Sequence, residues 1–192
     1  KGTANMAQVY KLVFAGPVGA GKTTAIQTLS DIEVVSTDAY ASDEVRLLKK
    51  TTTVAMDYGL MKLASGDQVR LYGTPGQQRF DFMWEILSEN ALGLVLMLKA
   101  SAPDPVADLR HYVQAFRSLI DETALVVGLT HSDAAGCQVR AQVMQALREL
   151  DLPPVVLDAD ARHRGHMSAL IKSLIYSIDP YQGSQTEPGW AA

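Results

Sequence analysis

The sequence has a single cysteine, no excess of basic residues and no long apolar run. Because Cys137 stands alone among 192 residues, an internal disulfide is excluded, and we expect this side chain to pack near a helix start. With 17 Lys and Arg against 21 Asp and Glu, the net charge of −4 gives no electrostatic reason to bind nucleic acid or an anionic membrane. No apolar stretch approaches the roughly 20 residues of a membrane-spanning helix. Without prenylation or myristoylation signals either, we expect a cytoplasmic protein with no direct membrane anchor and no nucleic-acid partner.

The sequence instead has the pattern of an α/β domain. Its 47% hydrophobic and 20% charged residues are ordinary for a globular protein. Apolar strand-like segments alternate with amphipathic ones, which predicts a largely parallel six-stranded sheet with helices on both faces. The strands are expected at residues 9–15, 54–63, 68–72, 93–98, 124–129 and 155–157, with a hairpin turn at 64–67.

Helical spacing of apolar residues predicts the connecting helices and bounds the domain. Such stripes occur at residues 106–120, 139–150 and 167–178, and a first helix is expected from residue 23. Residues 1–5 look like the remnant of an expression tag before Met6, and residues 180–192 are polar, with Pro and Gly, as in a flexible C-terminal tail. We therefore expect one domain over residues 6–179.

The most informative segment is GPVGAGKT at residues 16–23, which fits the phosphate-binding pattern G-x-x-x-x-G-K-[ST]. Glycines let the backbone curl so that several N–H groups point at a di- or triphosphate. Lys22 can then reach the β- and γ-phosphates, and the Thr23 hydroxyl can bind Mg²⁺. A predicted strand enters this loop and a predicted helix leaves it, as phosphate binding requires. The sequence thus predicts a nucleotide-binding protein.

Four further segments follow in chain order: TTTVAMDY at 51–58, GTPGQQRF at 73–80, LTHSD at 129–133 and DAR at 160–162. With the phosphate-binding loop, they make the chain resemble a small GTPase of the Ras superfamily. It is most similar to the bacterial MglA-like and conservon-type GTPases, which pair with roadblock-domain proteins. The resemblance implies the P-loop NTPase fold of a small G domain, with GTP or GDP and Mg²⁺ as ligands.

The resemblance also implies residue roles. Gln77 would orient the attacking water, Lys22 and Thr53 would complete the catalytic set, and Thr23 and Thr53 would bind Mg²⁺. Asp133 would accept hydrogen bonds from guanine. The residues expected to contact the nucleotide are Gly16, Val18, Gly19, Ala20, Gly21, Lys22, Thr23, Thr24, Gly76, Thr130, His131, Asp133 and Ala161.

Several positions depart from the family pattern. Gly73 stands where the family has an aspartate beside Mg²⁺, and either Asp57 or Asp38 is a candidate to replace it. Val18 stands where Ras has glycine, so a branched side chain would crowd an arginine finger. We therefore expect slow hydrolysis. Thr130 and His131 replace the asparagine and lysine of the base-recognition motif. His131 is expected to cover the base, and Thr130 to connect its loop to the phosphate-binding loop.

The segment after residue 78 is rich in aromatics. Phe80, Trp84 and Leu87 share one helix face, and Phe82 and Ile86 share another. Core packing and a nucleotide-dependent partner surface are equally compatible with this pattern.

The sequence is compatible with three functions. The first is a molecular switch that binds GTP with Mg²⁺, hydrolyses it slowly and recruits protein effectors in bacterial signalling. The second is a nucleotide-binding adaptor without effective hydrolysis, which the glycine at position 73 favours. The third is an ATP-dependent kinase of a small metabolite, for which the cluster at residues 162–164 is the only arginine-rich candidate.

Overall fold

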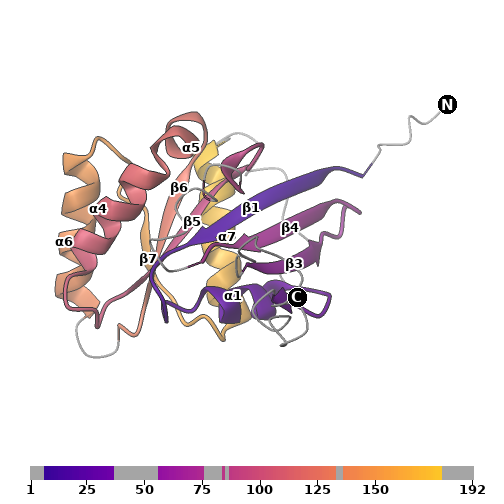
Figure 1. The fold of residues 1–192 in the computed structure, drawn as a ribbon, viewed down its shortest axis with the longest axis horizontal. Coiled ribbons are helices and arrows are strands. Elements are labelled where there is room, and N and C mark those ends of the chain that lie inside the picture. Colours follow the sequence, from indigo (N-terminus) through magenta and orange to yellow (C-terminus); the bar gives the residue numbers. More distant parts are fainter. Residues whose placement is uncertain (1–6, 37–55, 76–83, 85–86, 133–135, 179–192) are drawn as a thin grey trace, which may run out of the picture.

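The computed structural model describes residues 7–36, 56–75, 84, 87–132 and 136–178. Their order is strand, helix, three strands, then alternating strands and helices to the end of the domain (Figure 1). The elements are β1 (Val9–Ala15), α1 (Lys22–Leu29), β2 (Val35–Ser36), β3 (Asp57–Lys62), β4 (Gln68–Gly73), β5 (Gly93–Lys99), α4 (Pro105–Ala115), α5 (Arg117–Glu122), β6 (Leu125–Thr130), α6 (Gly136–Glu149), β7 (Val156–Asp158) and α7 (Arg164–Ile178). The expected terminal segments, 1–5 and 180–192, lie outside the described residues.

The sheet confirms the expected α/β class. Its strand order is β2-β3-β4-β1-β5-β6-β7. All pairings from β4 to β7 are parallel, whereas β3 runs antiparallel to both β2 and β4. The six expected strands are present, and the two-residue β2 adds a seventh at the edge. The turn between β3 and β4 lies where it was predicted. Gly66 has φ +90° there, and the N–H of Leu63 donates to the carbonyl of Asp67 at 2.9 Å.

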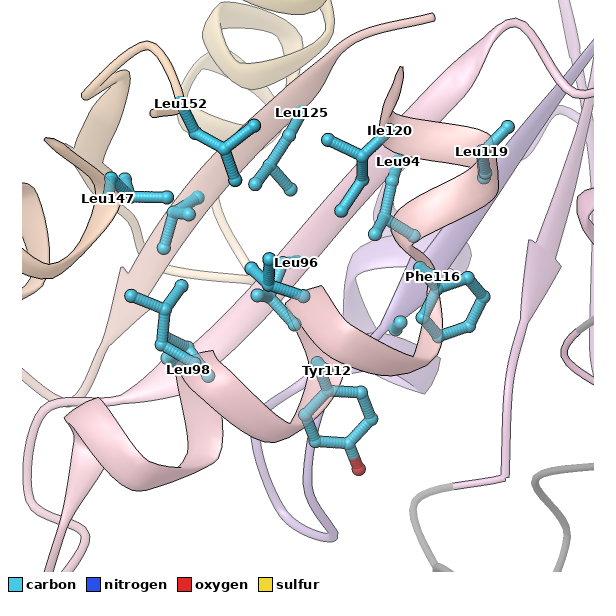
Figure 2. Packing of buried hydrophobic residues seen from close by; sticks show 14 of the residues in the cluster. Leu94, Leu96, Leu98, Tyr112, Phe116, Leu119, Ile120, Leu125, Leu147 and Leu152 are labelled. Carbon is cyan, nitrogen blue, oxygen red and sulfur yellow. The ribbon is translucent and has the colours of Figure 1, made fainter. Parts of the chain in front are cut away.

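Apolar side chains cover both faces of this sheet. Helices α1 and α7 pack on one face, and α4, α5 and α6 pack on the other (Figure 1). Figure 2 shows the second of these layers, where leucines of β5 meet Tyr112 and Phe116 of the helical layer. Strand β5 is buried over residues 93–98, as its continuous apolar run predicts for a strand covered on both faces. These two layers hold the carboxyl ends of the parallel strands in fixed positions.

Three expectations need correction or completion. The apolar stripe at 106–120 forms two helices, because the backbone at Phe116 leaves helical geometry (φ −103°, ψ 18°) and separates α4 from α5. Cys137 is exposed near the start of α6, so its expected packing role was wrong. Trp84 and Leu87 are buried, and the Trp84 ring stacks on Phe116 with centroids 5.1 Å apart. For these two residues the interpretation as core packing is confirmed; Phe80, Phe82 and Ile86 lie outside the described residues.

Within the described residues, no helix is long and apolar enough to cross a membrane.

Candidate functional site

The loop between β1 and α1 is shaped by glycines. Gly16 has φ +137°, and a Cβ placed there would lie 2.0 Å from the carbonyl oxygen of Met97, so only glycine lets the loop pass this close to β5. Gly21 has φ +96° and faces Ala161, whose Cβ would be 3.0 Å from an added Cβ. The glycines of the motif therefore let this loop lie directly against β5 and against the loop after β7.

Helix α1 begins directly after this loop with an open N-terminus. Its N-cap residue, Gly21, offers no side-chain acceptor, and the first turn contains no acidic residue. The first N–H groups of a helix have no partner within the helix, and the helix dipole places partial positive charge there. Thr23 is exposed and Thr24 half-buried beside these groups. The arrangement is suited to an anion such as phosphate.

Lys22 lies against its own loop. Its Nζ donates hydrogen bonds to the carbonyl oxygens of Gly16 at 2.6 Å and Pro17 at 2.9 Å, and the residue is only 8% exposed. Burial lowers the pKa of this ammonium from 10.5 to about 8, although attraction to the Asp57 carboxylate opposes that shift. The ammonium of Lys22 is thus buried and is held by two carbonyl oxygens of the phosphate-binding loop.

The loop after β6 is attached to the phosphate-binding loop through Thr130. Its buried hydroxyl lies 3.1 Å from the carbonyl oxygen of Ala20 and 3.2 Å from that of Leu98, and it donates to one of them at a time. His131 follows with φ +55°, and its Nδ1 lies 3.1 Å from the Thr130 hydroxyl. A threonine therefore connects two loops that are 110 residues apart in sequence.

The loop after β7 closes the same end of the sheet. The hydroxyl of Thr28 on α1 donates to the carbonyl of Ala161 at 2.7 Å. The Asp160 carboxylate accepts from the Arg162 guanidinium at 2.8 and 2.9 Å, which holds the pKa of that carboxyl well below its usual range. The backbone N–H of Asp160 donates to Nδ1 of His166 at 3.1 Å. These contacts fix the loop against both α1 and α7.

Together these three loops enclose one pocket of about 650 Å³ at the carboxyl ends of β1, β6 and β7, within the range of ligand sites. The glycines and the start of α1 line it together with the loops after β6 and β7. Its lining residues are Gly19, Gly21, Lys22, Thr23, Thr24, Thr130, His131, Ser132, Asp158, Ala159, Asp160, Ala161, Arg162 and His166.

Eight of the expected site residues therefore line one pocket, and the others are placed as follows. Gly16 and Ala20 are buried residues of the phosphate-binding loop, and the Val18 side chain of the same loop is 67% exposed. The described lining includes none of these three. Thr53, Gly76, Gln77 and Asp133 lie outside the described residues. Among the residues that the structure describes, no three acidic, histidine or cysteine side chains gather into a metal site.

Sequence reasoning missed several residues of this pocket. His166 lies on α7, six residues after Asp160, and no motif signals it. Asp158, at the end of β7, forms an ion pair with Arg140 of α6 at 2.9 Å. Both can be recognised as pocket residues only when β7 and α7 are placed beside the phosphate-binding loop.

The buried amine of Lys22 predicts a pH dependence for the nucleotide-free, metal-free protein. Because the folded state releases this proton near pH 8 and the unfolded state near 10.5, the unfolded state holds more protons between these values. The contribution of Lys22 to the free energy of unfolding should therefore rise on the order of 2 kcal/mol from pH 7 to 10. Urea unfolding at both pH values should show this rise in the wild type and in the exposed-lysine control Lys62→Met. It should be absent in Lys22→Met; parallel profiles in all three would contradict the prediction.

Comparisons with known proteins agree with a nucleotide pocket. The sequence model of a family described as "Conserved hypothetical ATP binding protein" matches residues 31–183, which begins after the phosphate-binding loop and covers most of the chain. The chain is also 28% identical over 123 residues to "Ras and EF-hand domain-containing protein" of Danio rerio, a match covering 62% of this chain and 17% of that protein.

A second relative is "Uncharacterized protein MJ1339" of Methanocaldococcus jannaschii, 32% identical over 91 residues. That match covers 47% of this chain and 51% of the relative. The chain therefore spans about half the length of one curated relative and a much smaller part of the other.

Proposed function

This chain belongs to the family of conserved hypothetical ATP-binding proteins, and from its phosphate-binding pocket and its resemblance to small GTPases we propose that it is a nucleotide-dependent molecular switch that takes GTP and GDP with Mg²⁺. We also propose that residues 6–179 act as a single G domain, outside which the two terminal segments lie. In this proposal GTP arranges the loops around Thr53 and Gln77 for effector binding, and hydrolysis releases them.

The observation that carries the proposal is the continuity of the pocket. Its lining includes the start of α1 and the loops of Thr130 and Ala161, so one cavity offers both an anion site and a surface for a base. A nucleoside di- or triphosphate has this polarity: charge at one end and a planar ring at the other. Lys22, with its ammonium beside the anion site, would move from the carbonyls of its own loop to the β- and γ-phosphates.

Guanine is the base that we propose. The carboxylate of Asp133 would accept from the N1–H and the 2-amino group of guanine, neither of which adenine has, and the backbone N–H of Ala161 would donate to O6. His131 would cover the ring. Support comes from Thr130, which connects the base loop to the phosphate-binding loop as the asparagine of the related motif is expected to do.

The donor set near the phosphates fits Mg²⁺, which prefers hard oxygen ligands. We propose that the hydroxyls of Thr23 and Thr53 hold it, where it would neutralise charge on the β- and γ-phosphates. Lys22 and the loop amides would bind the same oxygens, Gly76 would donate its N–H to the γ-phosphate, and Gln77 would orient water.

Hydrolysis is proposed to be slow for two reasons. The Val18 side chain is exposed on this loop, and in this proposal its branched side chain would crowd an inserted arginine. The aspartate expected beside Mg²⁺ is replaced by Gly73. The output of the switch is then a bound protein rather than a product. Roadblock-domain proteins are the proposed partner class, from the resemblance to MglA-like and conservon-type GTPases in bacterial signalling.

The family description favours a second candidate, an ATP-binding protein. In that case the same anion site would bind the triphosphate, and the loops after β6 and β7 would accept adenine. The two candidates differ in the base and share the phosphate chemistry.

Calorimetric titration with GDP, a non-hydrolysable GTP analogue, ADP and a non-hydrolysable ATP analogue, each with Mg²⁺, separates them. We expect guanine nucleotides to bind at least about tenfold more tightly than adenine nucleotides, and Asp133→Asn to remove most of that preference. Tight adenine binding without guanine binding would replace the first candidate by the second. Single-turnover GTP hydrolysis by the wild type and Gln77→Ala then distinguishes a slow switch, which loses hydrolysis in the variant, from an adaptor that has none to lose.

A further inference from the structure

The loop after β7 contains a backbone donor that the protein itself leaves unused. The other N–H groups of residues 159–163 each have an acceptor at 2.8 to 3.1 Å: Ala159 donates to the carbonyl of Leu129, Asp160 to Nδ1 of His166, Arg162 to Oδ1 of Asp160, and His163 to the carbonyl of Asp160. Within the described residues, the N–H of Ala161 donates to no acceptor. Because Ala161 lines the pocket, this donor is available to a ligand.

The orientation of this donor is fixed by the contacts around it. The carbonyl of Asp160, in the same peptide unit, accepts from the N–H of His163 at 2.9 Å. Because a trans peptide is planar, its N–H points opposite to its carbonyl, and so the Ala161 N–H points away from His163. The Cβ of Ala161 faces Gly21, and its carbonyl accepts from the Thr28 hydroxyl at 2.7 Å. These three contacts determine where the unused N–H points.

His166 holds the peptide unit that precedes this donor. It is the third residue of α7, and side chains in the first turn of a helix lean toward the helix N-terminus, which aims the ring at the loop. Its Nδ1 accepts from the N–H of Asp160 at 3.1 Å, so the proton of the neutral ring is on Nε2. The peptide unit that follows the donor is held by the Asp160 carboxylate, which accepts from the N–H of Arg162 at 2.9 Å. Both neighbours of the donor are thus anchored, one of them by a side chain of α7.

We propose that His166 is a positioning residue for the base. By accepting the Asp160 N–H, it keeps the loop in the conformation that presents the Ala161 N–H to an acceptor of the base, which is O6 of guanine in the proposed function. Without the Nδ1 acceptor, the Asp160 peptide is free to rotate, and the adjacent N–H loses its alignment with the base. This inference rests on the proposed nucleotide binding and adds to it a residue that acts through the loop.

The first test compares His166→Ala with the wild type for two nucleotides that differ in one atom. In 6-thio-GDP a sulfur, which is a weak acceptor, replaces O6, and the rest of the nucleotide is unchanged. By calorimetry in Mg²⁺ we expect the wild type to bind GDP about fivefold more tightly than 6-thio-GDP, the effect of one neutral hydrogen bond. The variant should lose this preference through about fivefold weaker GDP binding, with the affinity for 6-thio-GDP changed by less than about twofold. A general disturbance of the pocket would instead weaken both.

Two further substitutions separate the ring nitrogens of His166. His166→Asn places an amide oxygen near the position of Nδ1, where it can accept the Asp160 N–H, and it should restore the GDP affinity to within about twofold of the wild type. His166→Gln places its amide near the position of Nε2 and should behave as His166→Ala does. Because His166 is exposed, all three variants should fold, which thermal unfolding checks.

His163→Phe is the matched control. The His163 ring stacks on that of His166 with centroids 4.3 Å apart, but His163 is not part of the described pocket lining. Phenylalanine keeps a flat ring for this stacking and removes the ring nitrogens. The affinities for GDP and 6-thio-GDP should therefore stay at their wild-type values.

The outcomes separate this inference from the proposed function. If the wild type binds no purine nucleotide, the proposed function is wrong and the inference with it. If it binds GDP and 6-thio-GDP equally, or if His166→Ala weakens both equally, nucleotide binding stands and the role of His166 is overturned. Rescue by His166→Gln in place of His166→Asn also overturns it, because Nε2 would then contact the ligand directly. If ADP binds in place of GDP, the base acceptor for the same N–H is N1 of adenine, and 1-deaza-ADP, which has a carbon there, replaces 6-thio-GDP in the series.

Discussion

Replacing Lys22 by methionine is expected to lower nucleotide affinity by at least about 100-fold while the protein stays folded. The ammonium supplies charged hydrogen bonds to phosphate, each contributing roughly 1.5 to 3 kcal/mol, and two of them correspond to about two to four orders of magnitude in affinity. Folding should be preserved, because methionine has a similar length and removes an amine whose burial already lowers its pKa to about 8. Calorimetry in Mg²⁺, with the purine nucleotide that the wild type binds more tightly, measures the affinity.

The matched control for this prediction is Lys99→Met. Lys99 ends β5 and is half-buried, but it is not part of the described pocket lining. Its replacement should change the affinity by less than about threefold. A Lys22→Met protein that is folded and binds as the wild type does would mean that the pocket does not bind phosphate through this loop.

Gly16→Ala is expected to destabilise the fold by more than about 3 kcal/mol, among the largest effects of a single substitution. The added Cβ would lie 2.0 Å from the backbone oxygen of Met97, and the φ of +137° is unsuited to alanine, so β5 and the loop must both move. Because a backbone atom makes this contact, no side-chain rotation relieves it. Urea unfolding without nucleotide measures the loss.

Gly19→Ala provides the comparison, because it lies in the same loop. Gly19 has φ +77°, but an added Cβ would meet nothing within 4 Å. Its replacement should cost only the left-handed backbone penalty, about 1 to 2 kcal/mol. Equal losses in both variants would show that backbone conformation, and not the approach to Met97, makes glycine necessary at position 16.

Local patterns were sufficient to predict most of the architecture. Strands β1, β5 and β6 are apolar runs long enough to be recognised, and the loop motif lies between a strand and a helix in the structure as it does in the prediction. The hairpin at Gly66 was predictable because its turn depends on residues adjacent in sequence. The break at Phe116 was not, because the apolar spacing continues through it and only the backbone geometry at this residue separates the two helices.

The environment of single side chains was less accessible to sequence reasoning. Trp84 fits a core or a partner surface equally well by its spacing, and its burial depends on Phe116 and Tyr112, which lie about 30 residues further along the chain. Cys137 was expected to pack inside and is exposed, because the face of a helix that meets the core depends on how the helix docks.

The sequence by itself determined that a glycine-rich loop follows a buried strand and offers Lys22 and Thr23 at a helix start, because that chemistry is contained in eight consecutive residues. Only the tertiary structure decided what completes the pocket. Thr130, Ala161 and His166 reach it from β6, the loop after β7 and α7, and Asp57 stands beside Gly73 because two strands run antiparallel in one register. A sequence position carries a residue type, whereas the distance between two side chains is set by how the strands and helices pack.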